Sequence, residues 1–218
     1  MRSIKRLGVV LVAGAAAFSL AGAPAQASDT VDIAGKTLSG YKHVGQDTGY
    51  WCGPASAYIL ITGMKAHGKI KTTKSKSGLK LTQKNLASDT YLGANGGGGT
   101  QRADMRDGIN KWIGHKWYKV HSNPTPAEFK DRLLRAIPSG RGVAVAAYES
   151  AGKRHYNGHP KGKTIDHWVV ARGYTTNLSK TNFVDPATTV WSGVKPYFSH
   201  YTNSFVNVFV RPSKAIVW

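Results

Sequence analysis

The spacing of apolar residues changes along the chain, from a helical period in the first part to short β-like runs in the second. Pro54 suits the first turn of a helix, because the N–H that it lacks has no partner there in any case. Helix-compatible residues continue to Ile61, and Gly63 is expected to end the helix. This pattern predicts a first helix with Cys52 at its N-terminus.

Two further helices are expected downstream. Thr100 is placed to cap the first of them, whose apolar face would consist of Met105, Ile109, Trp112 and Ile113. Thr125, Pro126 and Glu128 predict the start of the next, with a capping threonine, a first-turn proline and the partner of a capping box. Its buried stripe would consist of Phe129, Leu133, Leu134 and Ile137. Pro138 is expected to stop it.

After Pro138 the chain contains short runs rich in β-branched and aromatic residues, separated by turn-rich segments. We expect strands over residues 143–148, 167–174, 182–184 and 205–210. Helices that come first, followed by strands, indicate an α+β fold with an antiparallel sheet rather than alternating βαβ units. No internal repeat and no long linker divides the chain.

The N-terminal segment has the pattern of a secretory signal. It begins with three basic residues, continues as an uncharged apolar run over residues 7–20, and ends in small residues at both positions of an A-x-A site. The run is short for a membrane span, and no later stretch approaches about 18 apolar residues. We therefore expect a signal peptide over residues 1–27 with cleavage after Ala27. The mature protein, residues 28–218, would be a single domain without a transmembrane segment, secreted from a bacterium.

Composition narrows the class of protein. The 218 residues carry 30 Lys and Arg against 11 Asp and Glu, a formal net charge of +19, yet 41% are apolar and 10% aromatic. Such a chain is too hydrophobic for a disordered polycation and long enough to form a core without staples. Its single Cys excludes an intrachain disulfide and a cysteine-rich zinc or iron–sulfur site. We expect a monomer without cofactor or metal.

The positive charge concentrates in two segments. One is the lysine-rich segment, residues 65–84, which has no acidic residue and is expected to be a mobile surface loop; the other is 153–163, which includes His155 and His159. Both segments have two interpretations: a binding surface for anionic cell-wall polymers, or a solvated surface that only keeps the protein soluble. Specific nucleic-acid binding is not expected, because no such motif is present and the aromatic residues do not alternate with the basic ones.

Cys52 is the first candidate for chemistry. A thiolate rather than a thiol is the nucleophile, and a helix N-terminus or a nearby imidazolium lowers the pKa of a thiol. Cys52 therefore has a suitable position, but it needs a histidine and a group to hold that histidine. The alternative is an inert structural residue, since free cysteines are commonly buried.

His167 and Asp185 could supply those groups. His167 begins the run 167–174, and Asp185 ends the next run, so a hairpin would bring both to one edge, with the carboxylate accepting from one ring nitrogen. Asp166 faces the other side of its strand and is less suited. The remaining histidines are expected at the surface: His43, His67, His115, His121, His155, His159 and His200. Taken singly, His167 and Asp185 could also be an ordinary sheet histidine and an Asp-Pro turn.

The combined motifs resemble a known family. Gln46, five intervening residues and Cys52-Gly53-Pro54, followed by Asp166-His167-Trp168 and Asp185-Pro186, resemble the C39-like branch of the papain-type cysteine peptidases. The resemblance implies a papain-like fold, in which a helical lobe with the cysteine packs on an antiparallel β lobe with the histidine and aspartate. It also implies roles: Cys52 as nucleophile, His167 as general base and acid, and Asp185 as its orienter. Gln46 and the Cys52 N–H would form the oxyanion hole.

Two departures limit what the resemblance carries. Trp51 stands where the family often has Asp or Asn, and the chain lacks the transporter to which the best-known leader peptidases are fused. We expect a secreted peptidase that acts on peptide or protein substrates through a thioester acyl-enzyme. The alternatives are a cell-wall amide hydrolase or acyltransferase with the same triad, or a non-catalytic cationic wall-binding module.

Overall fold

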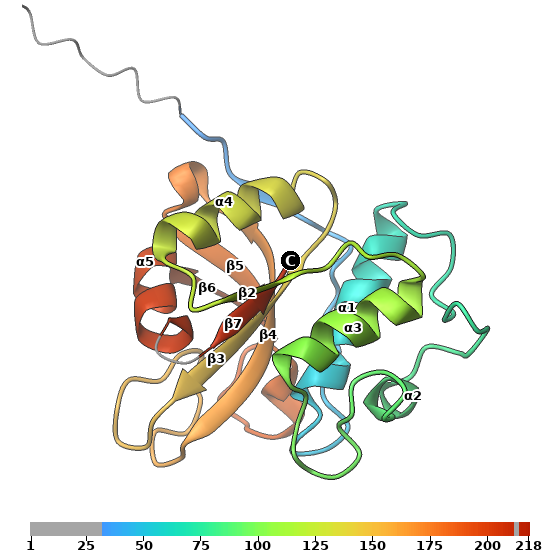
Figure 1. The fold of residues 1–218 in the computed structure, drawn as a ribbon. Helices are drawn as coiled ribbons and strands as arrows, with labels where there is room; N and C mark the ends of the chain where they lie inside the picture. Colours follow the sequence, from blue (N-terminus) through green and yellow to red (C-terminus); the bar gives the residue numbers. More distant parts are fainter. Residues whose placement is uncertain (1–31, 212–213) are drawn as a thin grey trace, which may run out of the picture. The chain divides into compact units, whose positions relative to one another are not determined.

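An antiparallel sheet forms the centre of the protein in the computed structural model, which describes residues 32–211 and 214–218 (Figure 1). Its strands run in the order β2-β7-β3-β4-β5-β6, and β1 pairs with β4. Their bounds are β1 Lys36–Thr37, β2 Val120–Ser122, β3 Val143–Glu149, β4 Ile165–Tyr174, β5 Lys180–Val184, β6 Tyr197–Tyr201 and β7 Ala215–Val217. The expected signal peptide, residues 1–27, lies outside the described residues.

Helices lie on both sides of the sheet. They are α1 Cys52–Ala66, α2 Gln83–Ala87, α3 Arg102–Ile113, α4 Pro126–Ala136 and α5 Thr202–Phe205, with short 3-10 helices η1 Thr176–Leu178 and η2 Pro186–Thr189 and a π-helix η3 Val206–Val210. Figure 1 shows α1, α2 and α3 gathered on one side, and α4 and α5 on the other. The predicted α+β class is confirmed. None of the helices in the described part of the chain combines the length and apolar content that a membrane span needs.

Helix α1 begins at Cys52, as predicted, but runs past the expected stop at Gly63 to Ala66. Gly63 serves close packing instead of ending the helix. A side-chain Cβ at this position would come within 2.6 Å of the Tyr41 ring, which is fully buried. The hydroxyl of Tyr41 donates to the Gly140 carbonyl at 3.0 Å and accepts from the Gly142 N–H at 2.6 Å. The glycine thus lets α1 approach the chain that leads into β3.

Capping residues were predicted at the starts of both α3 and α4. The prediction for α3 is wrong: Gln101 takes the capping position, and the carbonyl of Thr100 accepts from Trp168 Nε1 at 2.8 Å, which ties the helix start to β4. The capping box of α4, between Thr125 and Glu128, is confirmed. The predicted core residues Met105, Ile109, Trp112, Phe129, Leu133 and Ile137 are buried, whereas Ile113 and Leu134 are only partly buried.

The strand predicted over residues 205–210 is wrong, because this segment forms the end of α5 and the π-helix η3. Phe205, Val206, Phe209 and Val210 are buried, whereas Asn207 is exposed. That spacing is helical, and it overrides the β propensity of the valines and phenylalanines. The remaining strands of the sheet are β1, β2, β6 and β7, none of which was predicted.

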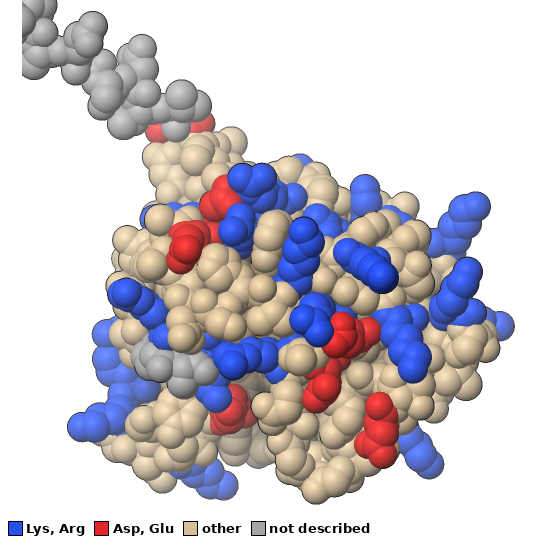
Figure 2. Space-filling view, in the orientation of Figure 1, with Lys and Arg blue, Asp and Glu red and all other residues tan. Residues whose placement is uncertain are grey.

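The lysine-rich segment, residues 65–84, covers the end of α1, the connection that follows and the start of α2. All of its lysines are exposed, whereas Ile70, Ser75 and Leu81 are buried and hold the connection against the helices. Figure 2 shows Lys and Arg side chains spread over one face of the molecule, with a smaller number of acidic side chains among them. Its predicted role as a binding surface stays a prediction.

Candidate active site

Cys52 is the first residue of α1 and is 6% exposed. The residue behind it, Gly53, packs against Thr100, whose hydroxyl would lie 2.2 Å from an added Cβ. This contact leaves no room for a side chain at that point and fixes the start of α1. The first N–H groups of a helix lack partners within the helix, so the thiol lies at the positive end of the helix dipole.

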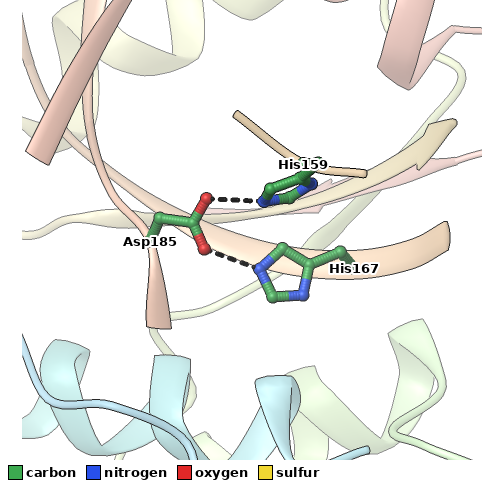
Figure 3. Close-up of side chains that lie close together, drawn as sticks. All are labelled: His159, His167 and Asp185. Carbon is green, nitrogen blue, oxygen red and sulfur yellow. Dashed lines mark hydrogen bonds and ion pairs between the residues drawn. The ribbon is translucent and has the colours of Figure 1, made fainter. Parts of the chain in front are cut away.

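His167 lies in β4, and Asp185 follows directly after β5. The two strands pair antiparallel, with Val170 opposite Val184, which brings the two side chains to the same edge. His167 Nε2 donates to Asp185 Oδ1 at 2.9 Å (Figure 3). Both side chains are at most 3% exposed. The other ring nitrogen points away from Asp185, and Cys52 is near enough to contribute to the raised pKa of His167.

The surroundings favour an ion pair in this cluster. Burial by itself lowers the pKa of His167, but the charge and hydrogen bond of Asp185, followed by those of Cys52, raise it to about 10. Burial raises the pKa of Asp185, and the charge of His167 together with hydrogen bonds from two histidines holds it well below its usual range. His167 is therefore an imidazolium and Asp185 a carboxylate at neutral pH.

His159 is a member of this cluster that the sequence did not reveal. The prediction of a surface position is wrong: His159 is 3% exposed, and its Nε2 donates to Asp185 Oδ2 at 2.9 Å. Its Nδ1 donates to Glu149 Oε2 at 2.6 Å, and Glu149 is also buried. The segment 150–163 is polar and basic, so its composition hides the fact that it folds back over the sheet. The available signal was Glu149, since an acid at the end of an apolar strand needs a buried partner.

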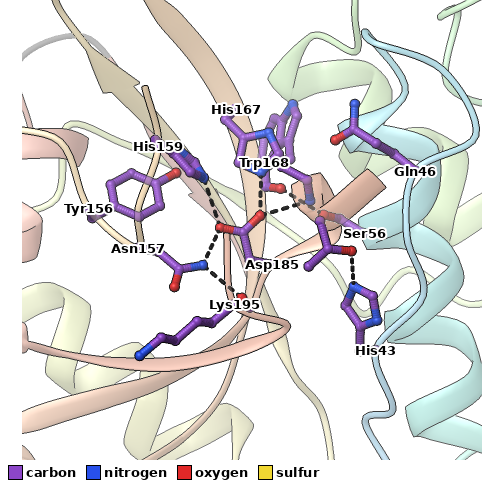
Figure 4. Close-up of polar contacts among 12 residues, drawn as sticks. His43, Gln46, Ser56, Tyr156, Asn157, His159, His167, Trp168, Asp185 and Lys195 are labelled. Carbon is purple, nitrogen blue, oxygen red and sulfur yellow. Dashed lines mark hydrogen bonds and ion pairs between the residues drawn. The ribbon is translucent and has the colours of Figure 1, made fainter. Parts of the chain in front are cut away.

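Asp185 is saturated with donors. Besides the two histidines, Asn157 Nδ2 donates to Oδ2 at 2.9 Å and the Ala187 N–H donates to Oδ1 at 2.9 Å (Figure 4). Asn157 has a φ of 48°, in the left-handed region that asparagine tolerates, and its side chain also donates to the Lys195 carbonyl at 2.8 Å. Four donors and no acceptor surround this carboxylate, so its ionised form is the one that the site accommodates.

Gln46 lies with Cys52 in the wall of the same pocket and is buried. Its Nε2 donates to the Thr48 carbonyl at 2.7 Å, and its Oε1 has no partner among the described residues. A primary amide has two N–H groups, so one remains after the bond to Thr48. The predicted oxyanion-hole role of Gln46 therefore stays a prediction, with one donor available for it.

Asp166 precedes His167 in β4 but is exposed and paired with Lys214. It makes no hydrogen bond to His167, whose acidic partner is Asp185. The alternation of side chains along the strand explains this difference, because neighbours in a strand face opposite sides.

The pocket above Cys52 has a volume of about 420 Å³. Its walls include Gln46, Cys52, Gly99, Thr100, His167 and Trp191. The Trp191 ring lies 4.9 Å from the ring of His159 and 6.2 Å from that of His167, so it covers both histidines on the pocket side. The glycine run Gly97, Gly98 and Gly99 also borders this pocket.

The donor atoms of His159, His167 and Asp185 lie within 4.8 Å of one another, a spacing that could surround a metal ion. However, each histidine already donates from Nε2 to the carboxylate that separates the two rings. A ligating nitrogen must offer a lone pair. The arrangement is therefore that of a hydrogen-bonded network, and the observed contacts leave no free set of ligand atoms in it.

The comparisons with known proteins identify the family and the fold. The model of the Peptidase_C39 like family matches residues 38–211. No curated protein matches the chain. The fold is similar to the crystal structure of the cysteine protease CMS1MS2 from Carica candamarcensis, with a TM-score of 0.51 and 14% identity over 81% of this chain and 91% of that one. The predicted papain-like fold is confirmed. The chain belongs to the Peptidase_C39 like family and is a cysteine-type peptidase.

Proposed function

We propose that the protein is a secreted peptidase that hydrolyses peptide bonds through a triad of Cys52, His167 and Asp185. The observation that supports it most directly is the 2.9 Å hydrogen bond from His167 Nε2 to Asp185, which leaves the other ring nitrogen for the thiol at the start of α1. An imidazolium held in this way stabilises a thiolate beside it.

The proposed reaction has two steps. In the first, the Cys52 thiolate attacks the carbonyl carbon, and His167 gives its proton to the leaving amine as the C–N bond breaks. In the second, neutral His167 takes a proton from water, whose oxygen attacks the thioester and releases the acid and the thiolate. The Cys52 N–H and the free N–H of Gln46 would stabilise the oxyanion of each step, at about 3 kcal/mol per donor.

The same triad supports a second candidate, a hydrolase or acyltransferase that acts on cell-wall amides. The observation that favours it is the basic surface: the exposed lysines of the lysine-rich segment would hold the enzyme on an anionic wall polymer. In the transferase an amine replaces water in the second step, and the cysteine chemistry is unchanged.

Alkylation of Cys52 tests the triad without a known substrate. Since the chain has a single Cys, the mass of one adduct reports the rate at that residue alone. We expect rapid labelling by iodoacetamide at pH 6, and labelling at least tenfold slower in His167→Ala, because an unassisted thiol is almost fully protonated at that pH. His115→Ala, at an exposed histidine outside the site, is the matched control. If Cys52 reacts no faster than a small-molecule thiol, the proposed triad is wrong.

A peptide library then separates the candidate reactions. The peptidase should produce new amino termini in the library, and Cys52→Ala should produce none. Products that form only when a wall-derived amine is added would instead identify the transferase. An active triad that cleaves purified wall but no library peptide would identify the wall amide hydrolase.

A further inference from the structure

A buried acid–histidine pair, Glu149 and His159, lies behind the triad and contacts it through Asp185. We propose that His159, held as an imidazolium between Glu149 and Asp185, is a positioning residue that fixes the Asp185 carboxylate for His167 and adds positive charge to the catalytic centre. This inference rests on the proposed function, because it assigns His159 a role toward the same triad.

The hydrogen-bond pattern sets the protonation of His159. Its two ring nitrogens each face a carboxylate oxygen, Nδ1 at 2.6 Å from Glu149 and Nε2 at 2.9 Å from Asp185. Ionised carboxylates only accept, so both nitrogens must carry a proton. A neutral His159 would require a protonated Glu149. Asp185 would then be the only carboxylate with a negative charge in contact with the two histidines. The charge-assisted form satisfies every donor and acceptor in the chain of contacts.

Electrostatics agrees with the hydrogen bonds. Burial alone lowers the pKa of His159, but the hydrogen bonds to Asp185 and Glu149, followed by the charge of Asp185, raise it above its usual value. The titratable groups packed around it come from four elements and one loop: Glu149 of β3, Asp185 after β5, His167 of β4, Tyr156 of the same loop and, beyond His167, Cys52 of α1. Two fixed negative charges therefore outweigh the repulsion from the imidazolium of His167.

Packing holds the ring of His159 in place. The Tyr156 ring lies 4.5 Å from it on one side and the Trp191 ring 4.9 Å on another. The Tyr156 ring stacks in turn on Phe198 at 5.5 Å, and the Tyr156 N–H donates to Glu149 Oε1 at 2.7 Å. With Nε2 fixed on Asp185 Oδ2, the second oxygen, Oδ1, is aimed at His167. His159 therefore orients the carboxylate that orients the catalytic histidine.

The charge of His159 should also act on the thiol. Its ring centroid is 5.2 Å from that of His167, the histidine that is proposed to act with Cys52. A positive charge at this range favours the anionic form of neighbouring groups. We therefore expect the loss of this charge to slow the reaction of Cys52 at acidic pH.

The first test uses the wild-type protein, in which nothing can fail to fold. Histidine labelled with 15N gives distinct ring-nitrogen shifts for the protonated ring and for each neutral tautomer. We expect both nitrogens of His159 to carry protons from pH 6 to pH 8. A single protonated nitrogen on His159 at pH 7 would overturn the proposal.

The second test is the pH profile of Cys52 alkylation in two variants. The acid limb of this profile is the range over which the labelling rate rises with pH. In His159→Gln we expect it to lie about half to one pH unit higher, with slower labelling at pH 5. Glu149→Gln removes a negative charge while its amide oxygen can still accept from Nδ1, so its limb should stay in place or move down. His115→Gln is the matched control. An unmoved limb in a folded His159→Gln would overturn the proposal, since a merely structural residue alters amplitude and stability without moving a pH limb.

The two hypotheses fail in different ways. If His167→Ala leaves Cys52 labelling unchanged, the triad itself is wrong. If His167→Ala abolishes the fast labelling and His159→Gln leaves the acid limb in place, the triad stands and the role of His159 is wrong. If His159→Gln folds poorly, the double variant His159→Gln with Glu149→Gln replaces it, because it removes both buried charges together. We expect the acid limb of this double variant to move up by less than half to one pH unit.

Discussion

The acid–histidine network and the lysine-rich segment differ in the surroundings of their charges. The network consists of Glu149, His159, Asp185 and His167, in which every charge is buried and contacts an opposite one. The lysine-rich segment, residues 65–84, exposes all its lysines and has no acidic residue among them. Two of the 11 acidic residues, Glu149 and Asp185, are thus buried in this network and do not neutralise the basic surface.

The difference follows from the solvent around each group. Water screens exposed lysines, so like charges can stand close together at little cost in folding free energy. A buried charge has lost its water, and it is tolerated only when hydrogen bonds and an opposite charge replace that water. Changes inside the network should therefore have large effects on activity and stability, whereas changes in the lysine-rich segment should have small ones.

The largest effect is expected from Asp185→Asn. An amide at this position cannot accept from both histidines, so His167 loses the partner that sets its orientation and protonation. We expect kcat/KM on a cleaved peptide to fall by on the order of 10³- to 10⁴-fold, as for other triads that lose their acid. Steady-state kinetics on a substrate selected from the peptide library would measure this effect.

Asp166→Asn is the matched control for that variant. It makes the same chemical change beside His167 in the sequence, at an exposed residue whose partner is Lys214. We expect its kcat/KM to stay within a few-fold of the wild type. Equal losses in both variants would contradict the assignment of Asp185 as the orienting acid.

An intermediate effect is expected on stability as the pH changes. The pKa of His167 is raised in the folded protein to about 10, and that of His159 is also raised, so their contribution is complete below the unfolded value near 6.5. It is lost as the pH rises from about 6.5 toward 10. The pKa of Asp185 is depressed, so its contribution is present above about 4 and lost at lower pH. Stability should thus be greatest between about pH 4 and 6.5.

Urea unfolding in Cys52→Ser protein, where the thiol cannot titrate, would measure this dependence. We expect the free energy of unfolding to fall by roughly 2–3 kcal/mol between pH 6.5 and 9.5. His167→Gln in the same background should show a shallower fall, because His159 is then the one member of the buried histidine pair that remains. A stability that rises over this range would show that the histidines are neutral in the folded state.

Much of the fold and part of the site follow from local patterns. The capping box at Thr125 and the Pro54 start of α1 depend on neighbouring residues, and the structure contains both. A hairpin between neighbouring runs predicts that His167 and Asp185 meet at one edge, and in the structure His167 Nε2 lies 2.9 Å from Asp185 Oδ1. These features need only a few residues in sequence or one strand pairing, which a single sequence can indicate.

The features that could not be predicted depend on contacts between distant segments. His159 lies in a basic loop, and nothing within that loop shows that it reaches Glu149 and Asp185. The segment 205–210 has strong β propensity, but the pattern of its buried positions places it in a helix. Gly63 resembles a helix stop, but α1 continues to Ala66, and the close approach of the Tyr41 ring explains why this position is a glycine. In each case a tertiary contact outweighs the local preference.

The smallest effect on folding is expected in the lysine-rich segment. Changing Lys71, Lys74, Lys80 and Lys84 to Gln should alter the free energy of unfolding by less than about 0.5 kcal/mol per residue, since exposed like charges contribute little.

If the lysine-rich segment binds an anionic polymer, the retention of this variant on purified cell wall should weaken and depend less steeply on salt. The control carries the same charge change at exposed lysines elsewhere: Lys42, Lys111, Lys116 and Lys119. Equal losses of retention in both variants would mean that total charge rather than this segment holds the wall. Unchanged retention in both would leave the segment as a solvated surface, the simplest role that its exposure allows.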